Sequence, residues 1–167
     1  SPQTLALAVI GPGKVGAALL DQLQAALPRL RSEANVDLRL RALATSRRMW
    51  LCDHGDPADW RTRIAEAPQP ADHDANTTHL RDRHLPHAVV IDCSASDSVA
   101  AQYPAWLAAG IHVITPNKHA GAGPLPRYAA IREARASSGA RFRYEATVGA
   151  GLPVISTLRD LLDTGDT

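Results

Sequence analysis

The sequence predicts an α/β fold built on a doubly wound, mainly parallel sheet with helices on both faces. Short apolar runs that end in glycine or small polar residues alternate with amphipathic runs of helical length. Glycine-rich turns join an apolar run to a helical run near both ends, in "VIGPGKVGAALL" and "YEATVGAGLPVISTL". The 167 residues, 45% hydrophobic and 21% charged, suffice for one domain with a substantial core.

Five or more strands are expected where apolar or β-branched residues run together. These segments are 5–10, 38–45, "HAVVIDCSAS" (87–96), "IHVITPNK" (111–118) and "RFRYEAT" (141–147). Because parallel strands end at one edge of a sheet, we expect their polar ends to meet there and to bind any ligand. Those ends read "GPGKVG", "ATSRR", "CSAS", "TPNK" and "EATVGAG".

Helices are expected between the strands, at residues 15–27, 98–109, 124–138 and 153–162. Pro28 and Gly110 are expected to end the first and the second, and Gly139 and Gly165 follow the third and the fourth. The polar region from 47 to 88 is the hardest to interpret. Within this region we expect one helix in "DPADWRTRIAEA", with Asp56 as its N-cap, and a second short helix in "NTTHLRDRHL".

The first glycine turn has the spacing G-x-G-x-x-G between a predicted strand and a predicted helix. This context is typical of a Rossmann-like dinucleotide site, where the glycines permit a tight turn, a close approach of the pyrophosphate and close packing of the helix. The helix N-terminus then offers N–H groups to the phosphates. The alternative is a tight βα turn without a ligand. The candidate cofactor-binding residues here are Gly11, Pro12, Gly13, Lys14, Val15 and Gly16.

The end of the second predicted strand indicates which dinucleotide is bound. NAD sites usually have an acidic residue there, but Glu33 and Asp37 precede the strand and no acid follows it. The segment instead offers Ser46, Arg47 and Arg48, and a guanidinium can bind a 2′-phosphate through two hydrogen bonds. We therefore predict a preference for NADPH, with NADH as the alternative cofactor. If this is wrong, Arg47 and Arg48 are a solvated helix start.

Two interpretations of the second glycine turn, "TVGAGLPV", stay open on the residues alone. It is either a plain βα turn with Pro153 at the first helical position, or a set of carbonyl oxygens that binds a hard cation beside Glu145.

The motifs "VIGPGKVGAALL", "VVIDCSAS", "GIHVITPNKHA" and "YEATVGAGLPVISTLRDLLDTGD", in this order, resemble homoserine dehydrogenase. The similarity is to the dehydrogenase half of bifunctional aspartokinase–homoserine dehydrogenases. It covers essentially the whole chain, and weakly the stretch 53–87. The family reduces aspartate 4-semialdehyde to homoserine with NADPH or NADH, on the route to threonine and methionine.

The resemblance also implies roles for individual residues. Ser94, Ala95 and Ser96 match positions that line the nicotinamide ribose. Lys118 matches a lysine beside the nicotinamide and the substrate, and is the candidate catalytic residue. Some family members bind a sodium ion in the second glycine turn, which implies a metal site at the positions of Glu145, Val148, Ala150 and Leu152.

The sequence departs from the family in its first turn and in its extent. Pro12 removes a backbone donor near the phosphates, for which the charge of Lys14 compensates. The family's substrate-binding and oligomerising domain is expected after residue 167. We therefore expect a dinucleotide-binding domain at residues 1–151 and a hinge helix at 152–167. Such a fragment is expected to bind NADPH without turnover, because the groups that position the substrate are missing.

Two other functions were considered, namely the cofactor domain of another NAD(P)-dependent dehydrogenase and a non-catalytic nucleotide-sensing module. The net charge of +1 argues against a nucleic-acid partner or an anionic membrane. No segment is apolar over the length of a membrane span, and Cys52 and Cys93 have no metal or redox spacing. We expect a cytoplasmic protein whose full-length form is a homo-oligomer acting on a small molecule.

Overall fold

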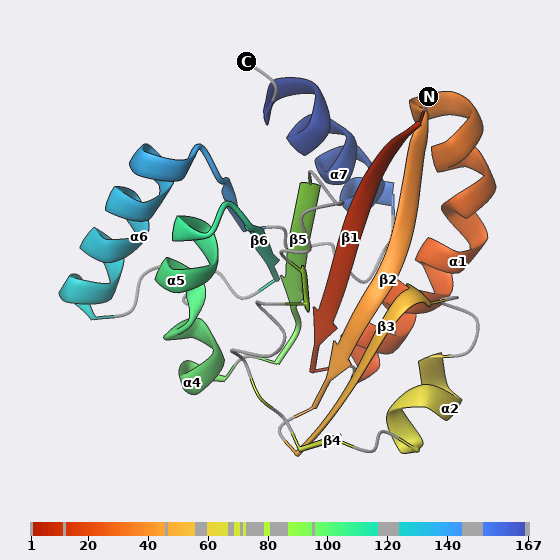
Figure 1. Ribbon diagram of the computed structural model, residues 1–167, viewed down its shortest axis with the longest axis horizontal. Helices are drawn as coiled ribbons and strands as arrows, with labels where there is room; N and C mark the ends of the chain where they lie inside the picture. The colour runs from red at the N-terminus through yellow and green to blue at the C-terminus, as the bar shows by residue number, and fades with distance from the viewer. Residues whose placement is uncertain are drawn as a thin grey trace.

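A mostly parallel sheet forms the centre of the protein (Figure 1). The structure is a computed structural model, which describes residues 2–11, 13–45, 47–55, 60–66, 69–70, 72, 79–80, 87–94, 96–116, 124–144 and 152–165. Within these residues the sheet has seven strands, in the order β4-β3-β2-β1-β5-β6-β7. The strands are β1 (Gln3–Ile10), β2 (Val36–Ala44), β3 (Arg48–Gly55), β4 (Gln69–Pro70), β5 (His87–Asp92), β6 (His112–Thr115) and β7 (Phe142–Tyr144).

Five of these strands are parallel, from β2 through β1, β5 and β6 to β7. β3 and β4 extend the sheet beyond β2 in antiparallel pairing. The chain passes from β1 through a helix to β2 on one side, and later returns to place β5 on the other side of β1. The strand order therefore reverses next to β1, and such a switch point is where α/β sheets bind ligands.

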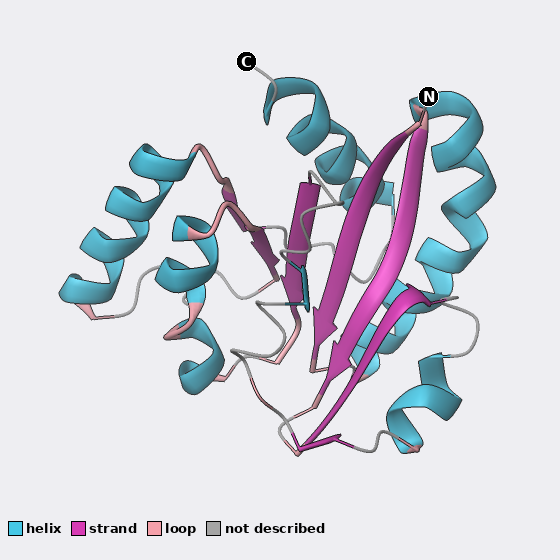
Figure 2. Ribbon diagram, viewed as in Figure 1, coloured by secondary structure: helices cyan, strands magenta, loops and turns pink. Residues whose placement is uncertain are grey.

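Helices cover both faces of the sheet (Figure 2). They are α1 (Lys14–Ala34), α2 (Trp60–Ala65), α4 (Asp97–Ala100), α5 (Tyr103–Ala108), α6 (Leu125–Ser138) and α7 (Leu152–Gly165). Alternate residues of β1 point to opposite faces, as the strand period requires. Leu5, Leu7 and Val9 pack with α1 and α7, whereas Ala6 and Ala8 pack with α5 and α6. The predicted doubly wound architecture is confirmed.

Pro28 does not end the first helix, contrary to the sequence-based prediction. α1 continues to Ala34 and ends at Asn35, whose φ of 55° is left-handed and whose N–H donates to the carbonyl of Leu30. A proline inside a helix costs roughly 3 kcal/mol. Leu30 beyond it is 1% exposed, and burying such a side chain stabilises by about 2 kcal/mol. The burial of Leu30 therefore offsets most of this cost, and Ala34, which packs against the same apolar cluster, contributes further to extending the helix beyond the proline.

The helix predicted over 98–109 is two helices, α4 and α5, which the turn at Ala101 and Gln102 separates. Pro104 lies in the first turn of α5, where its missing N–H is tolerated, but it cannot continue the hydrogen-bonding of α4. Gly110, with a φ of 83°, follows α5 as expected. Pro124 and Gly139 flank α6 as expected, and Gly139 caps it with a φ of 75°.

The segment after β2 is a strand and not a helix start. The Thr45 hydroxyl accepts hydrogen bonds from the N–H groups of Arg47 (3.2 Å) and Arg48 (3.0 Å), and the Thr45 N–H donates to the carbonyl of Arg48 (2.9 Å). This tight turn sends the chain back as β3. The predicted helix in "DPADWRTRIAEA" is confirmed as α2, although its predicted cap, Asp56, lies outside the described residues.

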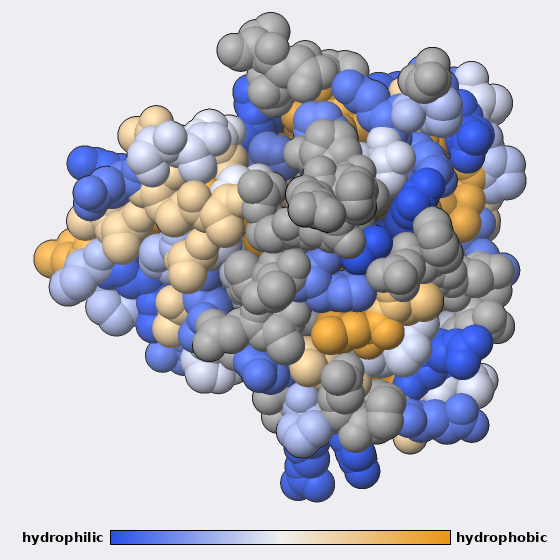
Figure 3. All heavy atoms as spheres, viewed as in Figure 1, coloured by the Kyte–Doolittle hydropathy of each residue, from blue (hydrophilic) through white to orange (hydrophobic). Residues whose placement is uncertain are grey.

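Hydrophilic and hydrophobic residues are mixed on the face drawn in Figure 3, and one hydrophobic spot lies at the start of α6. Leu125 and Tyr128 of this helix are exposed over 84% and 46% of their surface. No helix in the described part of the chain is both long and apolar enough to cross a membrane.

Candidate functional site

The first glycine turn lies at the switch point and is fixed to the neighbouring strands. The Gly11 N–H donates to the carbonyl of Ala44 at the end of β2 (2.8 Å), and the Cys93 N–H donates to the carbonyl of Ile10 at the end of β1 (2.8 Å). The ends of β2, β1 and β5 are thereby joined. Gly11 has a φ of 70°, which only glycine adopts readily.

Gly11 and Gly13 lack a side chain for different reasons. A Cβ on Gly11 would lie 2.5 Å from the Cα of Ser94, so the loop after β5 occupies the space. A Cβ on Gly13 would meet no described atom within 4 Å, so open space lies above this residue. Open space over the second glycine is what a dinucleotide pyrophosphate requires when it approaches the backbone.

The N-terminus of α1 faces this space and suits an anion. Gly13 is the N-cap and offers no side chain to cap the first N–H groups, and the first turn contains no acidic residue. Gly13, Lys14 and Val15 are exposed, whereas Gly16 is buried against the sheet. Uncapped N–H groups, the helix dipole and a lysine ammonium together favour a phosphate here. The positive φ of Gly11 and the burial of Gly16 fit the turn and the close helix packing expected of these residues, and the phosphate role of Gly13 stays a prediction.

The end of β2 presents two exposed arginines. The turn of Thr45 described above holds the backbone of Arg47 and Arg48, and both side chains are exposed. These residues lie on the opposite side of the glycine turn from β5. In a doubly wound sheet this is the side of the adenosine half of a dinucleotide.

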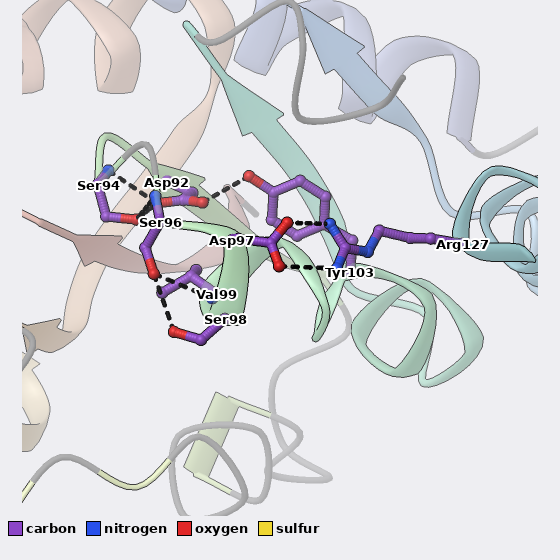
Figure 4. Close-up of polar contacts among 8 residues, drawn as sticks. All are labelled: Asp92, Ser94, Ser96, Asp97, Ser98, Val99, Tyr103 and Arg127. Atoms are coloured by element: carbon purple, nitrogen blue, oxygen red, sulfur yellow. Dashed lines mark hydrogen bonds and ion pairs between the residues drawn. The ribbon is translucent and has the colours of Figure 1, made fainter. Parts of the chain in front are cut away.

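Polar side chains form a connected network at the end of β5 (Figure 4). Asp92 is 1% exposed, and its Oδ1 accepts from the N–H (2.8 Å) and the hydroxyl (2.5 Å) of Ser94. Its Oδ2 accepts from the hydroxyl of Tyr103 (2.5 Å). The Ser96 N–H donates to the Ser94 Oγ at 3.2 Å. Asp92 therefore caps the turn that follows β5.

Two further contacts hold the start of α4. The Ser96 hydroxyl accepts from the Val99 N–H at 3.4 Å, as an N-cap does. Arg127 of α6 donates to the Asp97 carboxylate at 2.8 and 3.3 Å. The guanidinium lowers the pKa of that carboxyl, so the pair stays ionised at neutral pH. The loop after β5 is therefore connected to α6.

Cys93 follows β5 but is unsuited to nucleophilic chemistry. Burial raises the pKa of its thiol to about 12, and the nearby charge of Asp92 adds to the effect. The thiolate is the reactive form, so Cys93 is inert near neutral pH.

Several predicted site residues lie outside the described part of the chain, and their roles stay predictions. They are Pro12, Ser46, Ala95, Lys118, Glu145, Val148 and Ala150. Leu152 begins α7, and only its backbone is described. Among the described residues no three His, Cys, Asp or Glu side chains are grouped to hold a metal ion.

The predicted residues that are described lie along one edge of the sheet. Gly11, Gly13 and the start of α1 occupy its centre, with Arg47 and Arg48 on one side and Ser94 and Ser96 on the other. Sequence reasoning missed Tyr103 and Arg127, which hold the loop after β5. Tyr103 lies within an apolar helical pattern and nothing local marks its hydroxyl as paired, while Arg127 is one of many arginines.

Comparisons with known proteins agree with this geometry. The family model described as "Homoserine dehydrogenase, NAD binding domain" matches residues 11–145. A bifunctional aspartokinase/homoserine dehydrogenase of Arabidopsis thaliana is 48% identical over 99% of the chain, which spans 18% of that relative's length. A homoserine dehydrogenase of Schizosaccharomyces pombe is 31% identical over 96% of the chain and is matched over 43% of its own length.

A solved structure also shares the fold. It is a hyperthermophilic archaeal homoserine dehydrogenase in complex with NADPH, with a TM-score of 0.68 and 17% identity over 87% of this chain and 44% of that one. Because the two sequences are only 17% identical, this similarity shows a shared fold and nothing more. The family match and the sequence identity, together with a glycine turn built to receive a dinucleotide, show that the chain belongs to the homoserine dehydrogenase family, as its NAD-binding domain.

Proposed function

We propose that this chain binds NADPH in preference to NADH along the carboxyl edge of its sheet. The observation that carries the proposal is the open space over Gly13 at the uncapped N-terminus of α1. The N–H groups at the start of α1, from Lys14 and Val15, provide donors to the phosphate, and the Lys14 ammonium adds positive charge. Gly13, whose own N–H donates to the carbonyl of Gly11 (2.7 Å), leaves room for the phosphate. Residues past the end of β5, including Ser94 and Ser96, border the nicotinamide half.

Arg47 and Arg48 select the 2′-phosphate. Both are exposed at the end of β2, and their turn is closed by Thr45 without an acidic residue that would repel a phosphate. A guanidinium can bind a phosphate with two parallel hydrogen bonds, which NADH cannot use. Ser46, between Thr45 and Arg47, adds a hydroxyl to this set.

We propose that the parent protein is a homoserine dehydrogenase, as the relatives are named, and that its reaction is the NADPH-dependent reduction of aspartate 4-semialdehyde to homoserine. The nicotinamide, when bound, supplies the hydride. Lys118 places its ammonium beside the aldehyde oxygen and stabilises the negative charge that develops there. This chain spans 18% of the Arabidopsis relative. We propose that the parts of the parent protein that hold the substrate and form the homo-oligomer lie outside this chain, with residues 152–167 as the hinge. The present chain alone binds cofactor without turnover.

A sodium ion is proposed in the second glycine turn, held by oxygen atoms of Glu145, Val148, Ala150 and Leu152. It would brace the start of α7, from which the substrate domain follows. Replacing sodium by a bulky organic cation in the buffer should then lower the melting temperature. The predicted cytoplasmic location stays a prediction, since the plant relatives are named as chloroplastic.

Replacing arginine at the end of β2 tests the proposed function. Arg47→Ala should weaken NADPH binding by roughly tenfold, the value of one charge-assisted contact, and leave NADH binding within about twofold. Arg132→Ala, which removes an exposed arginine of α6, is the matched control and should change neither. An equal loss of NADPH and NADH affinity in Arg47→Ala would refute the 2′-phosphate role.

A further inference from the structure

A buried tyrosine hydroxyl connects the ends of β5 and β6, apart from the glycine turn. Tyr103 is fully buried, and its hydroxyl donates to Oδ2 of Asp92, the last residue of β5. The side chain of Thr115, the last residue of β6 and 1% exposed, also hydrogen-bonds with Tyr103. One phenol therefore ties together two neighbouring parallel strands at the edge where ligands bind.

The network continues into the loop after β5. The Asp92 oxygen that Tyr103 does not use accepts both the N–H and the hydroxyl of Ser94, and Ser94 in turn accepts from the N–H of Ser96. Ser94 lies directly against Gly11. The position of this loop against the glycine turn thus depends on Asp92, and Tyr103 holds that carboxylate from its other side (Figure 4).

The hydroxyl of Tyr103 is not needed to fill the core. Its ring packs at 6.1 Å from the ring of Trp106 and at 5.4 Å from that of Phe142, in an apolar cluster where a phenylalanine would fit equally well. Burial raises the pKa of this phenol far above its ordinary value, and the Asp92 charge adds to the shift. The hydroxyl therefore remains a donor at every working pH. Its partners, and not its packing, explain its presence.

We propose that Tyr103 is a positioning residue for the nicotinamide half of the cofactor. It holds the ends of β5 and β6 in register with one another, and with them the loop after β5 that carries Ser94. The proposal rests on the proposed cofactor binding and adds to it a residue that touches neither cofactor nor substrate. The adenosine half binds on the far side of the glycine turn, by β2, and should not respond to Tyr103.

The test is to compare two ligands on Tyr103→Phe by titration calorimetry. NADPH contains the nicotinamide, whereas 2′-phospho-ADP-ribose has the same adenosine half and pyrophosphate without it. In Tyr103→Phe, NADPH affinity should fall roughly tenfold, about the value of one buried hydrogen bond to a charged group, and the affinity for 2′-phospho-ADP-ribose should stay within about twofold. The fluorescence of bound NADPH should change as well, because it reports on the nicotinamide surroundings.

Tyr128→Phe removes an exposed hydroxyl from α6 and is the matched control, expected to alter neither affinity. Thr115→Val removes the second hydrogen-bond partner of the Tyr103 hydroxyl and keeps the side-chain volume. It should also weaken NADPH binding and leave the affinity for 2′-phospho-ADP-ribose unchanged. If Tyr103→Phe does not fold, the Thr115→Val result decides whether Tyr103 has the proposed role. Equal weakening of both ligands, or no change in either, would overturn the role of Tyr103 while the cofactor site stands. If the unaltered chain binds neither ligand, the proposed function fails and this inference fails with it.

Discussion

Gly11 and Ser94 are in direct backbone contact across the switch point of the sheet. A Cβ on Gly11 would lie 2.5 Å from the Cα of Ser94 and 2.8 Å from its N. Backbone atoms cannot move away as a flexible side chain could. Gly11 belongs to the turn that we propose receives the phosphates, and Ser94 to the loop that we propose borders the nicotinamide, so this contact would set the spacing of the two halves of the proposed site.

Gly11→Ala is therefore expected to damage folding as well as binding. The new Cβ collides with the backbone of Ser94, and the φ of 70° adds strain. We expect a loss of more than about 2 kcal/mol in the free energy of unfolding, measured by urea denaturation. Gly139→Ala is the control, because its φ of 75° carries the same strain and its Cβ meets no described atom; it should cost only about 1 kcal/mol. Equal losses in the two variants would contradict the steric account.

Gly13→Ala should separate binding from stability. Its Cβ meets no described atom within 4 Å and its φ of −79° is negative, whereas its ψ of −149° lies outside the main regions for alanine and adds some backbone strain. We expect a stability cost of at most about 1 kcal/mol, as for an N-cap change. The methyl group points into the proposed pyrophosphate space, so NADPH affinity should fall by roughly tenfold or more. Titration calorimetry measures the NADPH affinity of this variant, and urea denaturation measures its free energy of unfolding. Unchanged NADPH binding would exclude a phosphate over Gly13.

His112 should make the protein less stable in mild acid. It is 6% exposed in β6, and its Nδ1 accepts from the N–H of Arg141 at 2.9 Å. Burial, followed by the charges of His87, Arg141 and Arg143, lowers the pKa of His112 to about 4. The unfolded chain takes up the proton near pH 6.5 and the folded chain does not, so stability is fully present above pH 6.5 and falls as the pH drops toward 4.

The expected loss from this histidine is on the order of 2 kcal/mol between pH 7 and pH 4. Urea denaturation across that range should show a shallower pH dependence in His112→Gln than in the unaltered chain. Ser138→Ala, which removes a partly buried hydroxyl that does not titrate in this range, serves as control and should keep the original slope. An unchanged slope in His112→Gln would mean that other groups control acid stability.

The parts of the fold that were predictable depend on short-range patterns. The spacing of Gly11, Gly13 and Gly16 after an apolar run identifies the turn, because backbone geometry demands glycine there. Buried parallel strands are continuous apolar runs, which made β1, β5 and β6 recognisable. β2 was recognisable because apolar residues alternate with Arg39 and Arg41 before a final apolar run.

The parts that were missed depend on contacts between distant segments. Pro28 alone predicts the end of a helix, but α1 continues beyond it because residues such as Leu30 are buried against the sheet. β3 forms because the turn of Thr45 returns the chain to pair with β2, and its own sequence is mixed in polarity. Tyr103 pairs with Asp92, eleven residues away, so no local pattern reveals it.

The central claim is that this chain binds NADPH at the glycine turn and discriminates against NADH. The most direct measurement is titration calorimetry of the unaltered chain with NADPH and then with NADH, each with and without sodium. The account predicts one NADPH per chain, with an affinity at least about tenfold above that for NADH. Equal affinities would contradict the role of Arg47 and Arg48, and binding of neither cofactor would contradict the site itself.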